Sequence, residues 1–307
     1  MTPADTARLL LLGAMWGASY LFMRLGAGEF GALPLAALRA ALAALPMLAW
    51  LAASGQLDAL RRHWKPIALI GLANSALPYA CFGYAAQSLE AGLASIFAAA
   101  TPLMSALLAW AWLDERPGTR RLAGLVIGLL GVIALAWQHA GARDGSEGTQ
   151  LALAIGACLL APLAYAFAGC LAQRRLQAVP PLAAATGGQL AAAVTLALPA
   201  AWTWPAQAPS AGAWASAAAL ALACTAFAYP LFFGLIHRAG QARAATVTLL
   251  IPLFALAWGA LFLGERIQPD WLLGGALILG GTALALRAAR PAPAAGCDAR
   301  HHAPQRA

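Results

Sequence analysis

Long apolar runs, separated by short stretches that carry glycine, proline or charge, follow one another along almost the whole chain. A helix rises about 1.5 Å per residue, so about 20 apolar residues cross the ~30 Å hydrocarbon core of a bilayer. Ten runs meet this length, at about residues 7–27, 34–53, 66–87, 92–113, 121–139, 150–172, 181–201, 213–236, 243–263 and 270–288. The pattern predicts an all-α membrane protein with ten transmembrane helices.

Strands are a poor alternative, because the runs are rich in Leu and Ala and do not alternate apolar with polar positions. Residues 289–307 are rich in Ala, Pro, Arg and His, and we expect a disordered cytoplasmic tail there. Arg8 followed by an apolar run fits a cleaved signal peptide loosely. Trp16 and Arg24 extend this segment beyond a signal core, so we expect it to remain as the first helix.

Composition supports the membrane interpretation and excludes some functions. Hydrophobic residues make up 62% of the 307 residues and charged residues 10%, against about 25% charged residues in soluble proteins. The net charge of +8 resides in short loops and not on one basic face, which argues against a nucleic-acid partner. No pair of the five cysteines has CxxC spacing, so neither zinc nor a disulfide framework is indicated.

The distribution of Lys and Arg predicts the orientation, because basic residues gather in cytoplasmic loops. With the N-terminus inside, the cytoplasmic set is Arg8, Arg61, Arg62, Lys65, Arg116, Arg120, Arg121, Arg174, Arg175, Arg238, Arg243, Arg287, Arg290, Arg300 and Arg306. The outside set is Arg24, Arg143 and Arg266, and Arg39 lies within the second helix. We therefore expect both termini in the cytoplasm. The excess of Arg over Lys and the abundant Ala favour a bacterial source, and hence the cytoplasmic membrane.

An offset of 150 residues aligns the two halves of the chain. The matched pairs are Arg24 and Arg174, Trp64 and Trp214, Tyr79 and Tyr229, Phe82 and Phe232, Pro102 and Pro252, Glu115-Arg116 and Glu265-Arg266, Gly124 and Gly274, and Gly131 and Gly281. This predicts two repeats, over residues 7–139 and 150–288. Five helices in each repeat, an odd number, would insert the second half upside down, which is typical of transporters that alternate access about a midplane site.

Several of these motifs resemble the drug/metabolite transporter superfamily, in its bacterial EamA-type branch. The resemblance rests on Gly13-Ala-Met-Trp16-Gly17-Ala-Ser-Tyr20, on Arg24, on Ala94 to Pro102 with Asp114-Glu115-Arg116, on Thr246 to Pro252 with Gly264-Glu265-Arg266, and on Tyr165. It covers about residues 8–288. It implies ten helices around a central cavity and the export of amino acids or other small metabolites.

Polar and aromatic groups within membrane helices are candidates for a substrate site. Trp16, Tyr20 and Arg24 are spaced by four residues and so share one helix face. This face either lines the cavity or leaves Arg24 at the membrane interface. If Arg24 and Arg39 both face inward, they are expected to hold an anionic group by bidentate hydrogen bonds.

Further cavity candidates lie deeper in the predicted helices. Arg39 and its repeat mate Gln189 are both polar, and Arg39 is placed either in the cavity or at the interface. Tyr79 and Tyr229 are mates near the midplane, where they suit either a central site or core packing. Asn74 and Tyr165 complete the set.

Pro102 and Pro252 interrupt two predicted helices at matching positions and are either hinges or static bends. Glu115-Arg116 and Glu265-Arg266 are loop or gate candidates, with capping and topology as the alternative roles. Glu90 is the acid to test for coupling, because all eleven acidic residues fall in loops, ends or tails. The small multidrug-resistance proteins of the superfamily carry a membrane-embedded Glu in their first helix, and this chain has none there. Facilitated export, or coupling at the cavity mouth, is therefore favoured over a proton-coupled cation pump.

The sequence predicts a transporter that exports a small metabolite by alternating access, with a drug or toxic-compound efflux protein as the alternative. A membrane enzyme is less favoured, because the sequence contains no HExxH or GxSxG motif and no cluster of acids. A receptor or scaffold would have no need of inverted symmetry. The expected partners are a small-molecule substrate and the lipid bilayer, with no nucleic acid, cofactor or metal. The chain is expected to be a monomer or a weak homodimer.

Overall fold

A computed structural model describes residues 1–113, 117–140 and 146–287 of the chain. The predicted tail at residues 289–307 and the gate candidates Glu115 and Arg116 lie outside the described residues. Within the described ranges the secondary structure is helical and contains no strand, so the prediction of an all-α protein is confirmed there.

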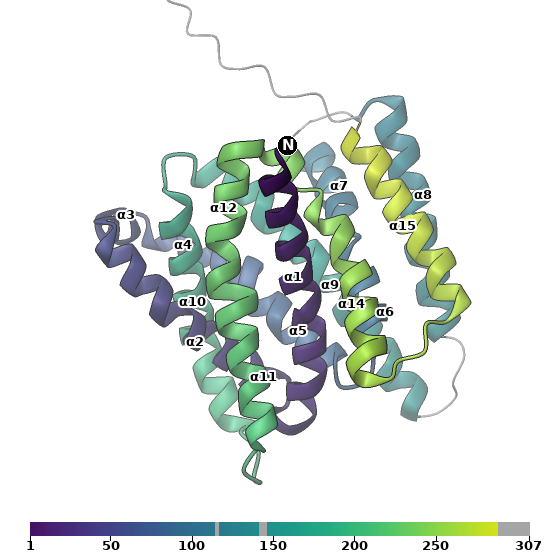
Figure 1. Cartoon of the computed structure of the whole chain (residues 1–307), viewed down its shortest axis with the longest axis horizontal. Helices are drawn as coiled ribbons and strands as arrows, with labels where there is room; N and C mark the ends of the chain where they lie inside the picture. Colours follow the sequence, from purple (N-terminus) through teal and green to yellow (C-terminus); the bar gives the residue numbers. More distant parts are fainter. Residues whose placement is uncertain (114–116, 141–145, 288–307) are drawn as a thin grey trace, which may run out of the picture.

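The helices form a bundle in which segments distant in sequence pack side by side (Figure 1). Their bounds are α1 Pro3–Phe30, α2 Ala32–Ala53, α3 Leu57–Arg62, α4 Trp64–Gly71, η1 Leu72–Ala76, α5 Leu77–Ala85, α6 Ala91–Ala98, α7 Thr101–Leu113, α8 Thr119–Ala140, α9 Ser146–Arg175, α10 Pro181–Trp202, α11 Ala211–Ala221, η2 Leu222–Phe227, α12 Ala228–Ala239, α13 Gln241–Ala244, α14 Val247–Leu263 and α15 Pro269–Arg287. Among the described residues, eight helical stretches are long and apolar enough to cross a membrane, and two shorter apolar helices, Val247–Leu263 and Pro269–Ala285, follow.

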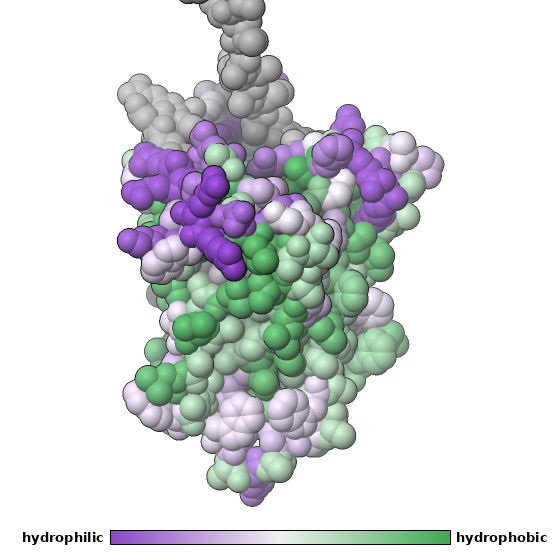
Figure 2. All heavy atoms as spheres, turned by 90° about the vertical axis from the view of Figure 1, so that its left-hand side faces the viewer, coloured by the Kyte–Doolittle hydropathy of each residue, from purple (hydrophilic) through white to green (hydrophobic). Residues whose placement is uncertain are grey.

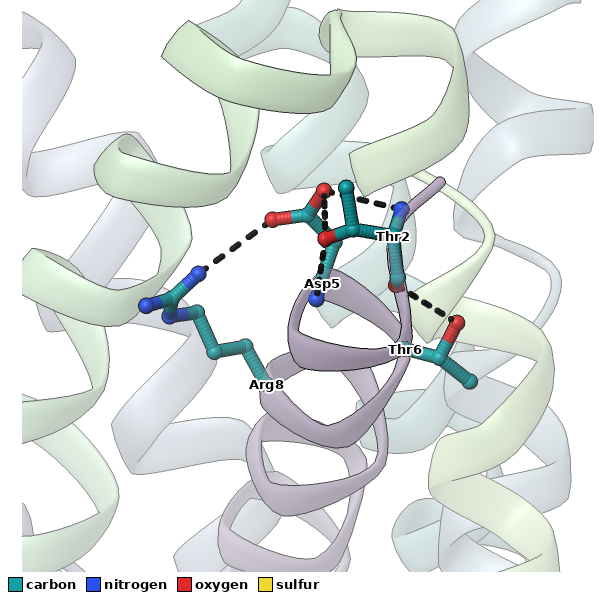
Figure 3. A network of polar contacts seen from close by, with 4 residues as sticks. All are labelled: Thr2, Asp5, Thr6 and Arg8. Carbon is teal, nitrogen blue, oxygen red and sulfur yellow. Dashed lines mark hydrogen bonds and ion pairs between the residues drawn. The ribbon is translucent and has the colours of Figure 1, made fainter.

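A capping box starts the first helix (Figure 3). The Thr2 hydroxyl accepts a hydrogen bond from the backbone N–H of Asp5, and the Asp5 carboxylate accepts one from the backbone N–H of Thr2, both at 3.2 Å. Arg8 lies 3.3 Å from the same carboxylate. These bonds satisfy N–H groups that the first helical turn leaves without partners. The helix therefore begins at Pro3, before the apolar run that predicts it.

Two membrane-length stretches contain a π-helical segment at matching positions. The segment η1 separates α4 from α5, and η2 separates α11 from α12, 150 residues further on. Pro78 and Pro230 follow these segments, and a proline frees the carbonyl four residues before it, here those of Asn74 and Ala226. A wider turn accommodates such a carbonyl, and π-turns are frequent at functional sites. The apolar pattern does not reveal these turns, although the two prolines were a usable signal.

Pro102 and Pro252 do not interrupt their helices at matching positions, which corrects the expectation of symmetric kinks. The first break lies at residues 99–100, so Pro102 is the second residue of α7. A proline in the first helical turn costs no hydrogen bond. Pro252 instead lies inside α14, which continues through it.

Two pairs of repeat mates pack directly against each other, namely α2 with α10 and α8 with α15. Gly124 lies against Gly281, and Gly131 lies against Gly274. Residue numbers rise along α8 while they fall along α15, so these two helices run antiparallel, side by side in Figure 1. The glycines allow the close approach, as small residues do between membrane helices. The largest buried apolar cluster joins both halves.

The outer surface has the banding expected of a membrane protein. Figure 2 shows a hydrophobic band across the middle of the molecule and hydrophilic residues gathered at the end where Figure 1 places the N-terminus. Exposed tryptophans lie at or near helix ends, namely Trp50, Trp64, Trp110, Trp112, Trp137, Trp202, Trp204 and Trp214. Tryptophan is enriched at both membrane–water interfaces, so these positions are consistent with two aromatic belts.

Candidate functional site

A cavity of about 740 Å³ lies among the helices and is lined by both halves of the chain. Its aromatic lining consists of Trp16, Tyr20, Tyr79, Phe82, Tyr165, Tyr229, Phe232 and Phe233. Its polar lining includes Ser19, Arg39, Asn74, Ser75, Thr101, Thr225, Gln241 and Thr248. Arg39 is the single charged side chain among the described lining residues.

Seven of the nine cavity candidates from the sequence line this space: Trp16, Tyr20, Arg39, Asn74, Tyr79, Tyr165 and Tyr229. Several of their rings pack in pairs. Trp16 contacts Phe232 with ring centroids 5.1 Å apart, and Tyr20 contacts Phe82 at 5.5 Å. The rings thus form an aromatic wall contributed by both repeats.

Arg39 reaches into the bundle from α2 and is only 8% exposed. Its Nε donates a hydrogen bond to the Thr225 hydroxyl at 3.1 Å, and its guanidinium carbon lies 3.9 Å from the centre of the Tyr79 ring. Its Nη1 lies 3.8 Å from the Met23 sulfur. No carboxylate of a described residue forms an ion pair with it. The structure therefore holds the charge inside the bundle and not at the membrane interface.

Gln189, the repeat mate of Arg39, lies just behind the cavity surface and is fully buried. Its Nε2 donates hydrogen bonds to the Ser75 hydroxyl at 3.2 Å and to the Tyr79 hydroxyl at 3.0 Å. Ser75 and Thr225 are themselves repeat mates. Each of these bonds joins the two halves. The bond from Gln189 to Ser75 thus matches the bond from Arg39 to Thr225, with the two halves exchanged.

The π-turns supply polar groups to the cavity, of which the sequence analysis identified Asn74 and missed Ser75 and Thr225. Asn74 and Ser75 come from η1, and Cys224 and Thr225 come from η2. The Thr225 hydroxyl donates to the carbonyl of Leu220 at 3.0 Å, five residues earlier. Because its proton is committed to this carbonyl, its lone pairs are oriented to accept from Arg39.

Arg24 is not among the lining residues, which corrects its assignment to the cavity and its expected pairing with Arg39. Its Nη1 donates to the carbonyl of Ala86 at 2.7 Å, just after the end of α5. A helix turns about 100° per residue, so eight residues carry Arg24 about 80° away from the direction of Trp16. A carbonyl at a helix end lacks an intrahelical partner and accepts this bond readily.

The candidates at the cavity mouth have structural partners. The Glu265 carboxylate accepts hydrogen bonds from the backbone N–H groups of Ala91 at 2.7 Å and Gly92 at 3.2 Å, and so caps α6. Glu90 precedes α6 and makes no side-chain capping bond, and Arg266 is exposed. Glu265 therefore takes the capping role that the sequence analysis gave as the alternative to a gate.

Apolar helices of membrane length around a cavity with one buried charge define a multi-pass membrane protein of the transporter type. The profile of the EamA-like transporter family matches residues 7–137 and again residues 152–287. The chain belongs to this family, and the resemblance to the drug/metabolite transporter superfamily is confirmed. The protein is a membrane transporter with two repeated halves.

No curated protein sequence matches the chain. A solved structure described only as a crystal structure of protein matches the fold with a TM-score of 0.64 and 21% sequence identity. The match covers 93% of this chain and 98% of that one, so the similarity extends over nearly the whole length of both chains.

Proposed function

We propose that the protein exports a small metabolite, such as an amino acid or a related compound, across the bacterial cytoplasmic membrane. The observation that carries the proposal is the cavity of about 740 Å³, which both halves line with aromatic rings and to which α2 contributes the buried Arg39. Ligand sites of this kind combine apolar walls with a few well-placed polar groups.

Transport would proceed by alternating access in a ten-helix bundle of two inverted repeats. The antiparallel packing of α8 against its mate α15 supports the inversion, because a two-fold axis in the membrane plane reverses the direction of mates. The matched hydrogen bonds from α2 to η2 and from α10 to η1 each join the two halves, and they support a binding site at the repeat boundary. The arginine-rich predicted cytoplasmic loops support an orientation with both termini inside.

No acidic side chain is among the described residues that line the cavity. This supports facilitated export, or coupling at the cavity mouth, over a proton-coupled cation pump. The extensive aromatic wall favours one second candidate, the efflux of drug-like or toxic compounds. The two candidates differ in range, because an efflux protein moves many unrelated apolar compounds and a metabolite exporter moves one class.

Efflux from preloaded cells tests the proposal, with a panel of amino acids, related metabolites and lipophilic dyes. Cells expressing the wild type, Trp16→Ala and Tyr79→Ala are compared at matched membrane abundance. Trp137→Ala is the control, because Trp137 is 79% exposed at the far end of α8. We expect saturable loss of one compound class that Trp16→Ala and Tyr79→Ala reduce several-fold and Trp137→Ala leaves unchanged.

Two results would contradict the proposal. If no compound leaves the cells, and the same panel run as uptake also shows no movement by properly inserted protein, transport of these classes is ruled out. If a compound is chemically converted and does not cross unchanged, the protein acts as a membrane enzyme on it.

A further inference from the structure

The cavity contains a positive charge with no negative partner among the described residues. Arg39 is nine-tenths buried, and its contacts are a hydroxyl, a tyrosine ring and a thioether. A buried charge is costly unless a counter-charge or hydrogen bonds compensate it. Aromatic and hydroxyl contacts reduce this cost without neutralising the charge. An anion that enters the cavity would therefore gain a favourable interaction that a neutral molecule would not.

The contacts of Arg39 also leave donors free. A guanidinium has five N–H donors. Nε donates to Thr225, Nη1 faces a sulfur that is only a weak acceptor, and no described residue accepts from Nη2. Tyr79 lies against the guanidinium face. A stacked, tethered guanidinium has a fixed plane, and its edge suits the two oxygens of a planar oxyanion.

We propose that the cargo is a small organic carboxylate with an apolar, preferably aromatic, body, and that its carboxylate pairs with Arg39. The body lies against the wall formed by Trp16, Tyr20, Phe82 and the neighbouring rings. This inference rests on the proposed function for the transport step, but the binding step stands without it. Gln189 occupies the matching position in the other half with no charge, so one carboxylate neutralises the pair.

An inorganic anion such as chloride shares the chemistry of the head group and lacks the body. Chloride would bind the guanidinium of Arg39 and make no specific contact with the aromatic wall. A carboxylate ligand uses both. The two are separated by comparing carboxylates whose bodies differ and by adding chloride as a competitor.

Binding to the purified full-length protein in lipid nanodiscs tests the proposal. The probes are 3-phenylpropionate, indole-3-acetate and hexanoate, each with its neutral amide, in a chloride-free buffer and then with added chloride. We expect the wild type to bind at least one carboxylate about tenfold or more tightly than its amide, as hydrogen bonds to charged groups imply. We expect the aromatic acids to bind more tightly than hexanoate.

Arg39→Gln should remove the preference for carboxylate over amide, and Arg39→Lys should retain part of it. Arg61→Gln is the matched control, since Arg61 is exposed in α3. The glutamine that replaces Arg39 would reproduce the chemistry of Gln189 beside a hydroxyl, and thermal unfolding checks that the variant folds. Thr225→Val, which keeps the charge and removes its tether, provides a second variant, and we expect it to lower the preference several-fold.

Equal binding of carboxylate and amide in every pair, or a preference that survives Arg39→Gln, would overturn the proposal. Arg39-dependent chloride binding with no carboxylate binding would also overturn it, in favour of an inorganic anion. A protein that binds carboxylates through Arg39 but moves none of them in cells would refute the proposed export and leave the binding inference intact.

Discussion

Two of the pairs of repeat mates that pack against each other, α2 with α10 and α8 with α15, differ in what they preserve. At α8 and α15 the contact is glycine on glycine, and both members of each pair are the same residue in the two halves. From α2 and α10 the side-chain contacts to the hydroxyls of η2 and η1 are repeated, but α2 supplies an arginine where α10 supplies a glutamine.

The two contacts differ because one serves helix packing and the other serves a binding site. Close backbone approach requires small residues on both helices, so symmetric packing keeps the glycines alike. A binding site for one asymmetric molecule gains nothing from two equal charges, and a second buried charge would need its own partner. The pseudo-symmetry is therefore retained in the glycine contact and broken at the polar one.

The largest effect is expected from a substitution that disrupts the glycine contact between α8 and α15. A Cβ atom on Gly281 would lie 2.5 Å from the carbonyl oxygen of Gly124 and from the backbone nitrogen of Gly128. We expect Gly281→Leu to lower the free energy of unfolding by about 3 kcal/mol or more, because overpacking forces the two backbones apart. Yield of monodisperse protein and the melting temperature measure this.

Its neighbour provides the control. Gly280 has open space where a side chain would project, so Gly280→Leu should fold like the wild type. Equal stability of the two variants would show that the glycine contact does not hold α8 to α15.

The second largest effect is expected when the side chains of the repeat mates Arg39 and Gln189 are exchanged. Arg39→Gln should weaken carboxylate binding about tenfold or more, and adding Gln189→Arg should recover most of it. The reason is that Gln189 contacts the Ser75 hydroxyl just as Arg39 contacts the Thr225 hydroxyl. An arginine at position 189 would therefore also have a hydroxyl beside it. Binding to nanodiscs measures both variants. A double variant no better than Arg39→Gln would mean that the two halves are not interchangeable at this site.

A smaller effect is expected from the hydroxyls. Thr225→Val keeps the side-chain volume but removes the acceptor for Arg39, and we expect carboxylate affinity to fall about three- to tenfold. Ser75→Ala should lower carboxylate affinity by less than Thr225→Val. The side chain that loses its hydroxyl partner is then Gln189, which is uncharged and keeps its bond to Tyr79. A larger loss for Ser75→Ala than for Thr225→Val, in the same binding assay, would argue that Gln189 is the more important of the two mates.

The smallest effect concerns Arg24, which the structure places outside the cavity. Because its guanidinium bonds to the carbonyl of Ala86, Arg24→Gln should change carboxylate affinity by less than about twofold while lowering the melting temperature slightly. A loss of affinity comparable to that of Arg39→Gln would restore the site of two arginines that the sequence analysis gave as the consequence of both facing inward.

Much of the candidate site could be found from the sequence, since polar groups in apolar runs are few and identifiable. Arg39, Tyr79 and Tyr229 were identified in this way and line the cavity. Thr225 and Ser75 were missed, because single hydroxyls are common in membrane helices and become informative only where a π-turn directs them. Arg24 was misplaced because four-residue spacing drifts around a helix by about 40° at each step.

The sequence by itself determined the helical class, the membrane setting and the two repeats. The reason is that the thickness of the bilayer core sets the length of each apolar run, and this length can be read from neighbouring residues alone. The offset of 150 residues likewise needs no coordinates. Only the tertiary structure decided which mates touch, where Arg24 points and that Glu265 caps α6. It also placed Arg39 on Thr225, 186 residues away. These contacts join residues far apart in sequence, and they depend on helix rotation and packing, which local periodicity does not fix.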